Sequence, residues 1–180
     1  YTGSVMAIDP SGRGADESSW AVVKMLNGFL YVTSAGGLPG GYSEDTLKQL
    51  AMTAKEQEVN LILIESNFGD GMFTQLLKPV LSKIYRVTCE EVRHSTSKER
   101  RICDTLEPVM NSHRLILDRK VVENDFDSTR HLPPEKALRY QLMYQMSRVT
   151  RHKGALAHDD RLDVLAMAVS YWTDQMAQDA

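Results

Sequence analysis

Short apolar runs alternate along the chain with segments of helical period, and the early apolar runs end at an acidic residue. The first of these, residues 4–9 (SVMAID), predicts a buried strand because it is followed at once by a Gly-rich turn sequence. Residues 20–35 are two β-rich runs joined by Asn27-Gly28, the dipeptide typical of a two-residue hairpin turn. We therefore expect the first three strands to form an antiparallel meander.

Helices and strands alternate beyond this meander. Leucine and alanine recur at helical spacing in residues 42–59, with Ser43 as the expected N-cap. The pattern further predicts strands at 60–65, 85–92 and 114–118, and helices at 72–84, 97–113, 133–152 and from about 157 to 175, the first of them interrupted or kinked near Pro79. This order predicts an α/β fold, a mixed sheet with helices on both faces.

Composition and charge exclude several classes of protein. The chain has 180 residues, 42% of them hydrophobic and 25% charged, which is typical of one globular domain. No apolar run approaches the roughly 20 residues that cross a bilayer. Cys89 and Cys103 lack CxxC spacing, which argues against a zinc site. A net charge of −3 argues against coating nucleic acid by charge alone, but acidic metal ligands are compatible with an enzyme acting on it.

Acidic residues follow two of the predicted strands directly. Asp9 ends the first strand, and Glu65 ends the apolar run LILI. A strand-terminal Asp before Pro10 is often only a turn residue, but Glu favours neither strands nor turns. If the two strands are neighbours, about 4.8 Å apart, their carboxylates emerge side by side and can share a cation.

A third acidic group opens the final helix, which is apolar nearly all round. Asp159, Asp160 and Asp163 fall within five residues. One of them is explained as a helix cap or by the helix dipole, but three would repel one another unless a cation binds them. Together with Asp9 and Glu65 they offer hard oxygen ligands only, which selects Mg²⁺ or Mn²⁺ over zinc. Two such ions held by carboxylates suit phosphodiester hydrolysis.

Four motifs carry a family resemblance. The stretches AIDPSGRGADE, LILIESNFGDGMF, KERRICDTLEPVMNSHRLI and GALAHDDRLDVLA occur in this order between Val5 and about Trp172. Together they resemble the C-terminal nuclease domain of the large terminase subunit of tailed double-stranded DNA phages, most closely the podovirus type. The resemblance implies an RNase H-like fold and a metal-dependent endonuclease that cuts concatemeric DNA during packaging.

The resemblance also implies roles for individual residues. The family's acids map to Asp9, Glu65 and Asp160, with Asp163 where related resolvases have a further aspartate. Asp159 competes with Asp160 for the same role. We therefore expect Asp9, Glu65, Asp160 and Asp163 to be catalytic, the first three of them as metal ligands.

The sequence lacks the GxxxxGK[ST] phosphate loop that the family's ATPase motor would contain. We therefore expect residues 1–180 to be a single nuclease domain without the N-terminal motor. The partners implied are double-stranded DNA, the ATPase domain of the full-length protein, the phage portal and the small terminase subunit, with no membrane. The location implied is the host cell cytoplasm, at the procapsid portal.

Basic residues gather in two further stretches, RHSTSKERR and RVTRHKG. From these we select Lys98, Arg101 and Arg151 as contacts to DNA phosphates, together with Arg13 in the Gly-rich turn. Such charge runs are as often only a solvated face.

Other functions remain open on the sequence alone. A Holliday-junction resolvase shares the fold and the acids, and cleavage of four-way junctions instead of linear duplex would identify it. A phosphate-binding ATPase relative would bind nucleotide without nicking DNA. An HD phosphohydrolase has an all-helical fold, which the predicted hairpin and buried strands oppose. A non-catalytic docking module would leave the acids unexplained.

Overall fold

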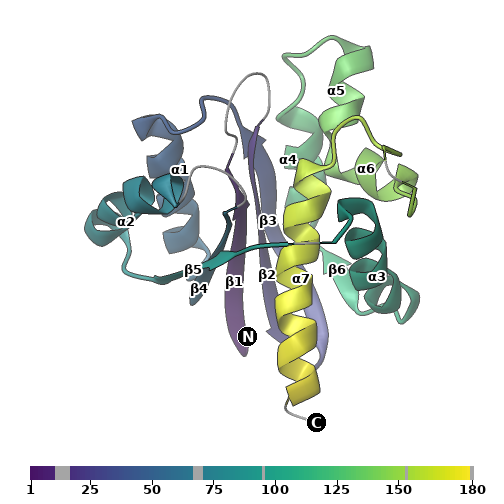
Figure 1. The fold of residues 1–180 in the computed structure, drawn as a ribbon, viewed down its shortest axis with the longest axis horizontal. Helices are drawn as coiled ribbons and strands as arrows, with labels where there is room; N and C mark the ends of the chain where they lie inside the picture. Colours follow the sequence, from purple (N-terminus) through teal and green to yellow (C-terminus); the bar gives the residue numbers. More distant parts are fainter. Residues whose placement is uncertain (11–16, 67–70, 95, 153, 179–180) are drawn as a thin grey trace.

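A computed structural model describes residues 1–10, 17–66, 71–94, 96–152 and 154–178. Its centre is a six-stranded mixed sheet with the strand order β5-β4-β1-β2-β3-β6 (Figure 1). The strands are β1 (Gly3–Asp9), β2 (Ser18–Leu26), β3 (Phe29–Leu38), β4 (Leu61–Glu65), β5 (Thr88–Val92) and β6 (Leu115–Leu117).

The predicted meander is confirmed. β1 pairs antiparallel with β2, and β2 pairs antiparallel with β3. The turn between β2 and β3 has positive φ at both central residues, 52° at Asn27 and 80° at Gly28, as a type I′ hairpin requires. The later strands add in parallel, β4 beside β1, β5 beside β4, and β6 beside β3.

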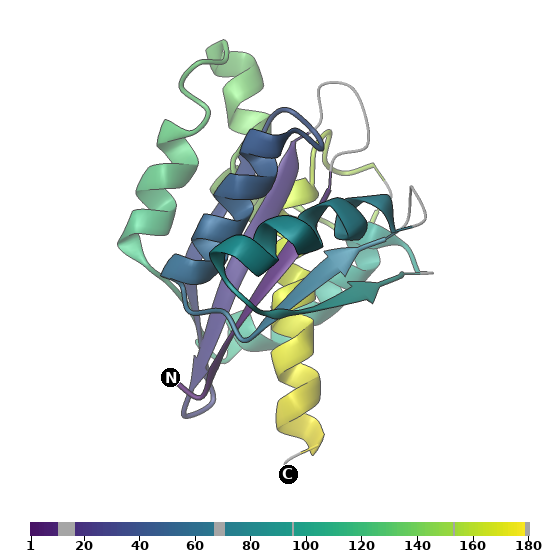
Figure 2. The same cartoon turned by 90° about the vertical axis from the view of Figure 1, so that its left-hand side faces the viewer.

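Helices cover both faces of the sheet, as expected. Within β1 the side chains alternate: Met6 and Ile8 pack under α1 and α2, whereas Val5 and Ala7 share a core with α3 and α7. Figure 2 shows α1 and α2 in front of the sheet and α7 behind it. The helices are α1 (Glu44–Glu56), α2 (Met72–Ile84), α3 (Lys98–Asn111), α4 (Arg119–Asp127), α5 (Pro134–Tyr140), α6 (Leu142–Arg148) and α7 (Asp160–Gln178).

Two helix boundaries follow from local chemistry. The Ser43 side chain accepts a hydrogen bond from the Thr46 amide, so the predicted N-cap of α1 is confirmed. The helix expected to be interrupted or kinked near Pro79 is not interrupted, because α2 runs through this residue as one helix. α7 begins at Asp160, three residues later than expected, because its first backbone hydrogen bond runs from the Asp163 amide to the Asp159 carbonyl.

The segment between β6 and α7 differs most from expectation. α4 was not predicted; Asp118 caps it by accepting from the Lys120 amide. The single helix expected at 133–152 is wrong, because the chain is extended at Gln141 (ψ 132°) between α5 and α6. Asp125 of α4 accepts from the amides of Leu142 and Met143, at 2.7 and 2.9 Å, and so caps a new helix start.

The C-terminal half of α7 is fixed to the sheet. The Trp172 indole nitrogen donates to the Val23 carbonyl across 2.9 Å, and the ring packs against Gly3.

Within the described parts of the chain, we find no helix with the length and apolar character that a membrane crossing needs.

Candidate metal centre

Two neighbouring parallel strands bring the first two acids together. Ile8 of β1 is paired with Ile64 of β4, so Asp9 and Glu65 both come next, at the same edge of the sheet. This is the carboxyl edge of β1 and β4, where ligands bind in open α/β sheets. The strand adjacency that the sequence analysis required is thus present.

The first turn of α7 supplies the third carboxylate. Asp163 is fully buried, and one oxygen from each of Asp9, Glu65 and Asp163 lies within 4.8 Å of the others. The three residues come from β1, β4 and α7, segments far apart in the sequence. One cation placed among them can contact all three groups.

Burial and mutual repulsion make these acids hard to ionise together. Burial, with Glu65 and Asp160 nearby, raises the pKa of Asp9 to about 9. Burial, then the charge of Asp163, raises the pKa of Glu65 to about 7, and a hydrogen bond with the Asp163 carboxyl group adds to this rise. Near neutral pH, full ionisation of the cluster therefore calls for a compensating positive charge.

The donor set fits a hard divalent cation. All three groups offer carboxylate oxygens, and no sulfur or imidazole ligand joins them within the described residues. The buried Oδ2 atom of Asp163 accepts no hydrogen bond from the part of the chain that the structure describes. A cation would satisfy this oxygen and replace the protons that the raised pKa values imply.

Asp160 lies beside this cluster. Its carboxylate is 3.7 Å from the Lys98 ammonium, which is also 3.3 Å from Asp159 and 3.6 Å from Asp163. Asp160 is close enough to raise the pKa of Asp9. The structure thus assembles Asp9, Glu65 and Asp163 most tightly, with Asp160 and Asp159 at the rim. The expectation of Asp160 as a ligand stays a prediction.

Lys98 and Arg101, two of the predicted phosphate contacts, project from the start of α3 into the acidic site. The Arg101 Nη2 atom is 2.7 Å from Asp163 Oδ1. Burial alone would lower the pKa of Lys98, but four surrounding aspartates outweigh it and raise the pKa above its usual value. The Lys98 ammonium therefore stays charged, and together with the Arg101 ion pair it partly neutralises the acids.

The two other predicted DNA contacts lie elsewhere. Arg151 makes exposed ion pairs with Asp104 and Glu107 of α3, at 3.2 and 2.6 Å. These pairs are apart from the carboxylate cluster, and both acids would have to release the guanidinium before it could bind phosphate. Arg13 lies outside the described residues.

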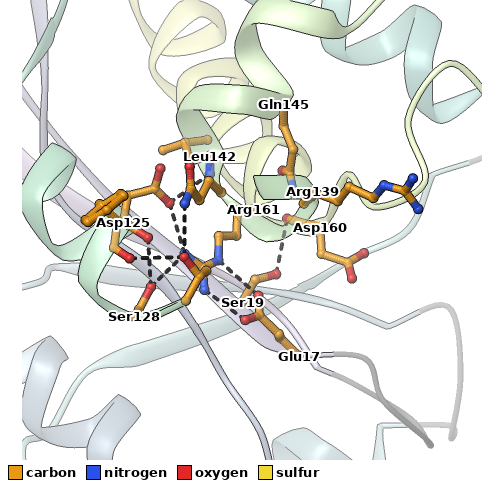
Figure 3. Close-up of polar contacts among 12 residues, drawn as sticks. Glu17, Ser19, Asp125, Ser128, Arg139, Leu142, Gln145, Asp160 and Arg161 are labelled. Carbon is orange, nitrogen blue, oxygen red and sulfur yellow. Dashed lines mark hydrogen bonds and ion pairs between the residues drawn. The ribbon is translucent and has the colours of Figure 1, made fainter. Parts of the chain in front are cut away.

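Sequence reasoning missed a buried arginine next to the acids. Arg161 is 1% exposed, and its guanidinium bonds to Glu17, Asp125 and Ser128 (Figure 3). The signal was available: Arg161 is the one basic residue in the otherwise apolar and acidic run DDRLDVLAMAV, where a buried charge requires partners. Its partners are distant in sequence, so only the fold identifies them.

Comparisons of sequence and fold place the chain among known proteins. A family model described as "Terminase Bacteriophage T7, Ribonuclease H-like domain" matches residues 8–115. The large terminase subunit of Enterobacteria phage T3 is 47% identical over 180 residues, which is all of this chain and 31% of that protein. The chain thus spans under a third of the length of this curated relative.

Solved structures share the fold at low sequence identity. The human cytomegalovirus terminase nuclease domain, soaked with manganese and inhibitor-bound, has a TM-score of 0.65 and 14% identity, covering 97% of this chain and 84% of that one. For a variant nuclease domain of the large terminase subunit of bacterial virus Sf6 with manganese and β-thujaplicinol, the TM-score is 0.63, the identity 12% and the coverage 93% and 87%. The large terminase nuclease of thermophilic phage G20c with bound zinc gives 0.55, 15%, 93% and 81%. The expected RNase H-like fold is confirmed.

Proposed function

Because the chain belongs to the ribonuclease H-like domain family of T7-type phage terminases, we propose that it is an Mg²⁺- or Mn²⁺-dependent endodeoxyribonuclease. In this proposal it is a single nuclease domain that cuts concatemeric double-stranded DNA with little sequence preference. The observation that carries the proposal is the set of carboxylate oxygens of Asp9, Glu65 and Asp163, all within 4.8 Å of one another. A carboxylate cluster of this kind suits hydrolysis assisted by two metal ions.

In this proposal the acidic residues bind the metal ions and the basic residues bind the DNA phosphate. Asp9, Glu65 and Asp163 would hold the metal ions, and Asp160, at the rim, would complete a second position. Bound metal supplies an activated water and stabilises the leaving oxygen. Lys98 and Arg101, now paired with the acids, would turn to the scissile phosphate once the cations take over that charge.

Three comparisons support the choice of metal. The cytomegalovirus and Sf6 structures contain or were soaked with manganese, and the same variant of the Sf6 nuclease domain was also determined with calcium. All-carboxylate ligands favour Mg²⁺ and Mn²⁺ among the ions available for phosphoryl chemistry. The zinc in the G20c protein would find no cysteine or histidine in the cluster of this chain, within the described residues.

The wider assignment follows the relative in phage T3. We propose that the domain acts with an ATPase domain of the same full-length protein, and with the portal and small terminase subunit, at the procapsid in the host cytoplasm. Arg13 and Arg151 stay predicted DNA contacts in this proposal. A role at the portal would explain low sequence preference, since position on the DNA would then be set by the packaging machinery.

The test is nicking and linearisation of supercoiled plasmid with Mn²⁺, compared with EDTA. Asp9→Asn, Glu65→Gln, Asp163→Asn and Asp160→Asn should each lower the rate by about 100-fold or more, because each removes a ligand charge that the cations need. Glu56→Gln, at the distant end of α1, is the matched control and should cut normally. If one of the four site variants cuts at the wild-type rate, that residue has no role in catalysis. Preference for a four-way junction over linear duplex would instead indicate a resolvase.

A further inference from the structure

The first turn of α7 is held by a buried arginine that points away from the metal centre. The Arg161 Nε and Nη2 atoms bond to the two carboxylate oxygens of Glu17, at 3.0 and 2.8 Å. Its Nη1 atom bonds to Asp125 Oδ1 and to Ser128 Oγ, each at 2.9 Å. Figure 3 shows the guanidinium between these partners. A planar group bonded on three of its edges has almost no freedom to turn.

The same turn is held from two other directions. The Leu162 amide, which needs a partner at a helix start, donates to Gln145 Oε1 of α6 across 3.0 Å. The Asp160 carbonyl accepts from Ser19 Oγ of β2 across 3.1 Å. The backbone of residues 160–162 is therefore tied to both the sheet and the α4–α6 helices.

These contacts leave the aspartates of this turn to face the metal centre. Side chains one or two positions apart on a helix point in different directions, so Arg161 faces away from Asp160 and Asp163. Glu17 and Asp125 together more than balance the arginine charge. Arg161 therefore does not neutralise the carboxylates beside it in the sequence. Because the Leu162 amide donates to Gln145, no aspartate of this turn is needed to cap that amide.

Stability alone is a poor explanation for this arrangement. Burying an ion pair costs desolvation energy, and well-packed apolar side chains often serve stability as well or better. Apolar contacts are not directional, so they fix the orientation of a helix less strictly than hydrogen bonds do. Bonds of fixed geometry to Glu17, Asp125 and Ser128 define both the rotation and the height of α7 against the sheet.

We propose that Arg161 is a positioning residue for the metal centre, and that Glu17, Asp125 and Ser128 form the socket that holds it. This inference rests on the proposed function. The socket places the Asp163 carboxylate against Asp9 and Glu65, and Asp160 at the rim. Asp125 of α4 bonds to Arg161 and also anchors the start of α6. The socket therefore links both helices to the turn of α7 that carries the cation ligands.

The test uses the 180-residue chain with Glu17→Gln and Arg161→Lys. Each keeps a polar side chain of similar length, but neither can form the paired, charged contact between Arg161 and Glu17. We expect the dissociation constant for Mn²⁺, measured by calorimetry without DNA, to rise about 10-fold or more, as is typical when the groups supporting a ligand are changed. In EDTA, hydrogen exchange at the amides of Leu162 and Asp163 should become faster.

Two control variants separate positioning from folding. Arg130→Lys alters an exposed ion pair with Asp127 near the end of α4 and should bind Mn²⁺ as the wild type does. Leu50→Ala, on the buried face of α1, should lower the melting temperature without changing Mn²⁺ affinity. Equal loss of Mn²⁺ affinity in Leu50→Ala would overturn the inference. Wild-type affinity and exchange rates in both socket variants would do the same.

The outcomes also separate this inference from the nuclease proposal. A wild-type chain that binds Mn²⁺ through the three acids but never cuts DNA would refute the nuclease activity. Weakened Mn²⁺ binding in the socket variants would then still support the positioning role. A wild-type chain that binds no Mn²⁺ would overturn both the metal centre and the positioning role.

Discussion

Asp9 and Glu65 stand one position beyond the paired residues Ile8 and Ile64 of two neighbouring parallel strands. Their side chains therefore leave the sheet at the same edge, where the fully buried Asp163 meets them from the first turn of α7. The folded chain thereby concentrates negative charge in a poorly hydrated place. Much of what can be measured on this domain should depend on how that charge is compensated.

Stability without metal should fall as pH rises. The pKa of Asp9 is about 9 in the folded chain and 3.8 at its ordinary value, so between these limits the folded chain binds more protons than the unfolded chain. The free energy of unfolding then decreases with pH, by on the order of 4 kcal/mol between pH 6 and pH 9, because one extra bound proton is worth about 1.36 kcal/mol per pH unit. Thermal melting in EDTA should show a fall of roughly 10 °C over this range.

Saturating Mn²⁺ should remove most of this pH dependence, because the cation replaces the protons. Asp9→Asn should remove most of the decrease above pH 8 in EDTA, because only Glu65, with a pKa of about 7, then still titrates in this range. Melting temperatures that stay level or rise from pH 6 to pH 9 in EDTA would contradict the assigned electrostatics.

Lys98→Met should separate metal binding from catalysis. The ammonium lies within 3.3 to 3.7 Å of Asp159, Asp160 and Asp163 and repels an incoming cation. Without it, we expect Mn²⁺ to bind several-fold more tightly in calorimetry, while plasmid cleavage falls about 10-fold or more from the loss of a phosphate contact. Lys48→Met, on the exposed face of α1, should change neither quantity. Weaker Mn²⁺ binding in Lys98→Met would show that the lysine organises the acids instead of competing with metal.

Gly37→Ala should disturb the metal centre through Glu17. A Cβ atom at position 37 would lie 2.1 Å from Glu17 Oε2, so the carboxylate that holds Arg161 would have to move. We expect a loss of about 1–3 kcal/mol in unfolding free energy together with weaker Mn²⁺ binding. The double-mutant cycle with Glu17→Ala is the check, because Gly37→Ala should cost little once the Glu17 carboxylate is absent.

Trp172→Phe should weaken the fold and leave the metal centre intact. The indole nitrogen donates to the Val23 carbonyl in the core, and its loss leaves that carbonyl without this donor. We expect a cost of about 1–2 kcal/mol and a melting temperature several degrees lower. The Mn²⁺ affinity should stay at the wild-type value, because Trp172 lies near the other end of α7 from the acids. A parallel loss of affinity would mean that the whole helix, not its first turn, sets the ligand positions.

The sequence alone predicted the parts of this fold that depend on neighbouring residues. The Asn27-Gly28 turn, the Ser43 cap and the alternation of strands and helices each depend on backbone preference or on hydrophobic period. The acids at the ends of the first and fourth strands were recognisable for the same reason. A charged residue directly after a buried apolar run needs an explanation wherever the strand lies in the sheet.

The fold decided whatever depends on partners distant in the chain. Asp125 divides the helix expected at 133–152 by capping Leu142 and Met143, and no local pattern encodes that contact. The choice between Asp160 and Asp163 in the tight cluster depends on how far α7 is rotated. Arg161 sets that rotation through Glu17 and Asp125, which are 144 and 36 residues away along the chain. Residue types and spacing thus predicted the chemistry of the site, and long-range polar contacts decided its geometry.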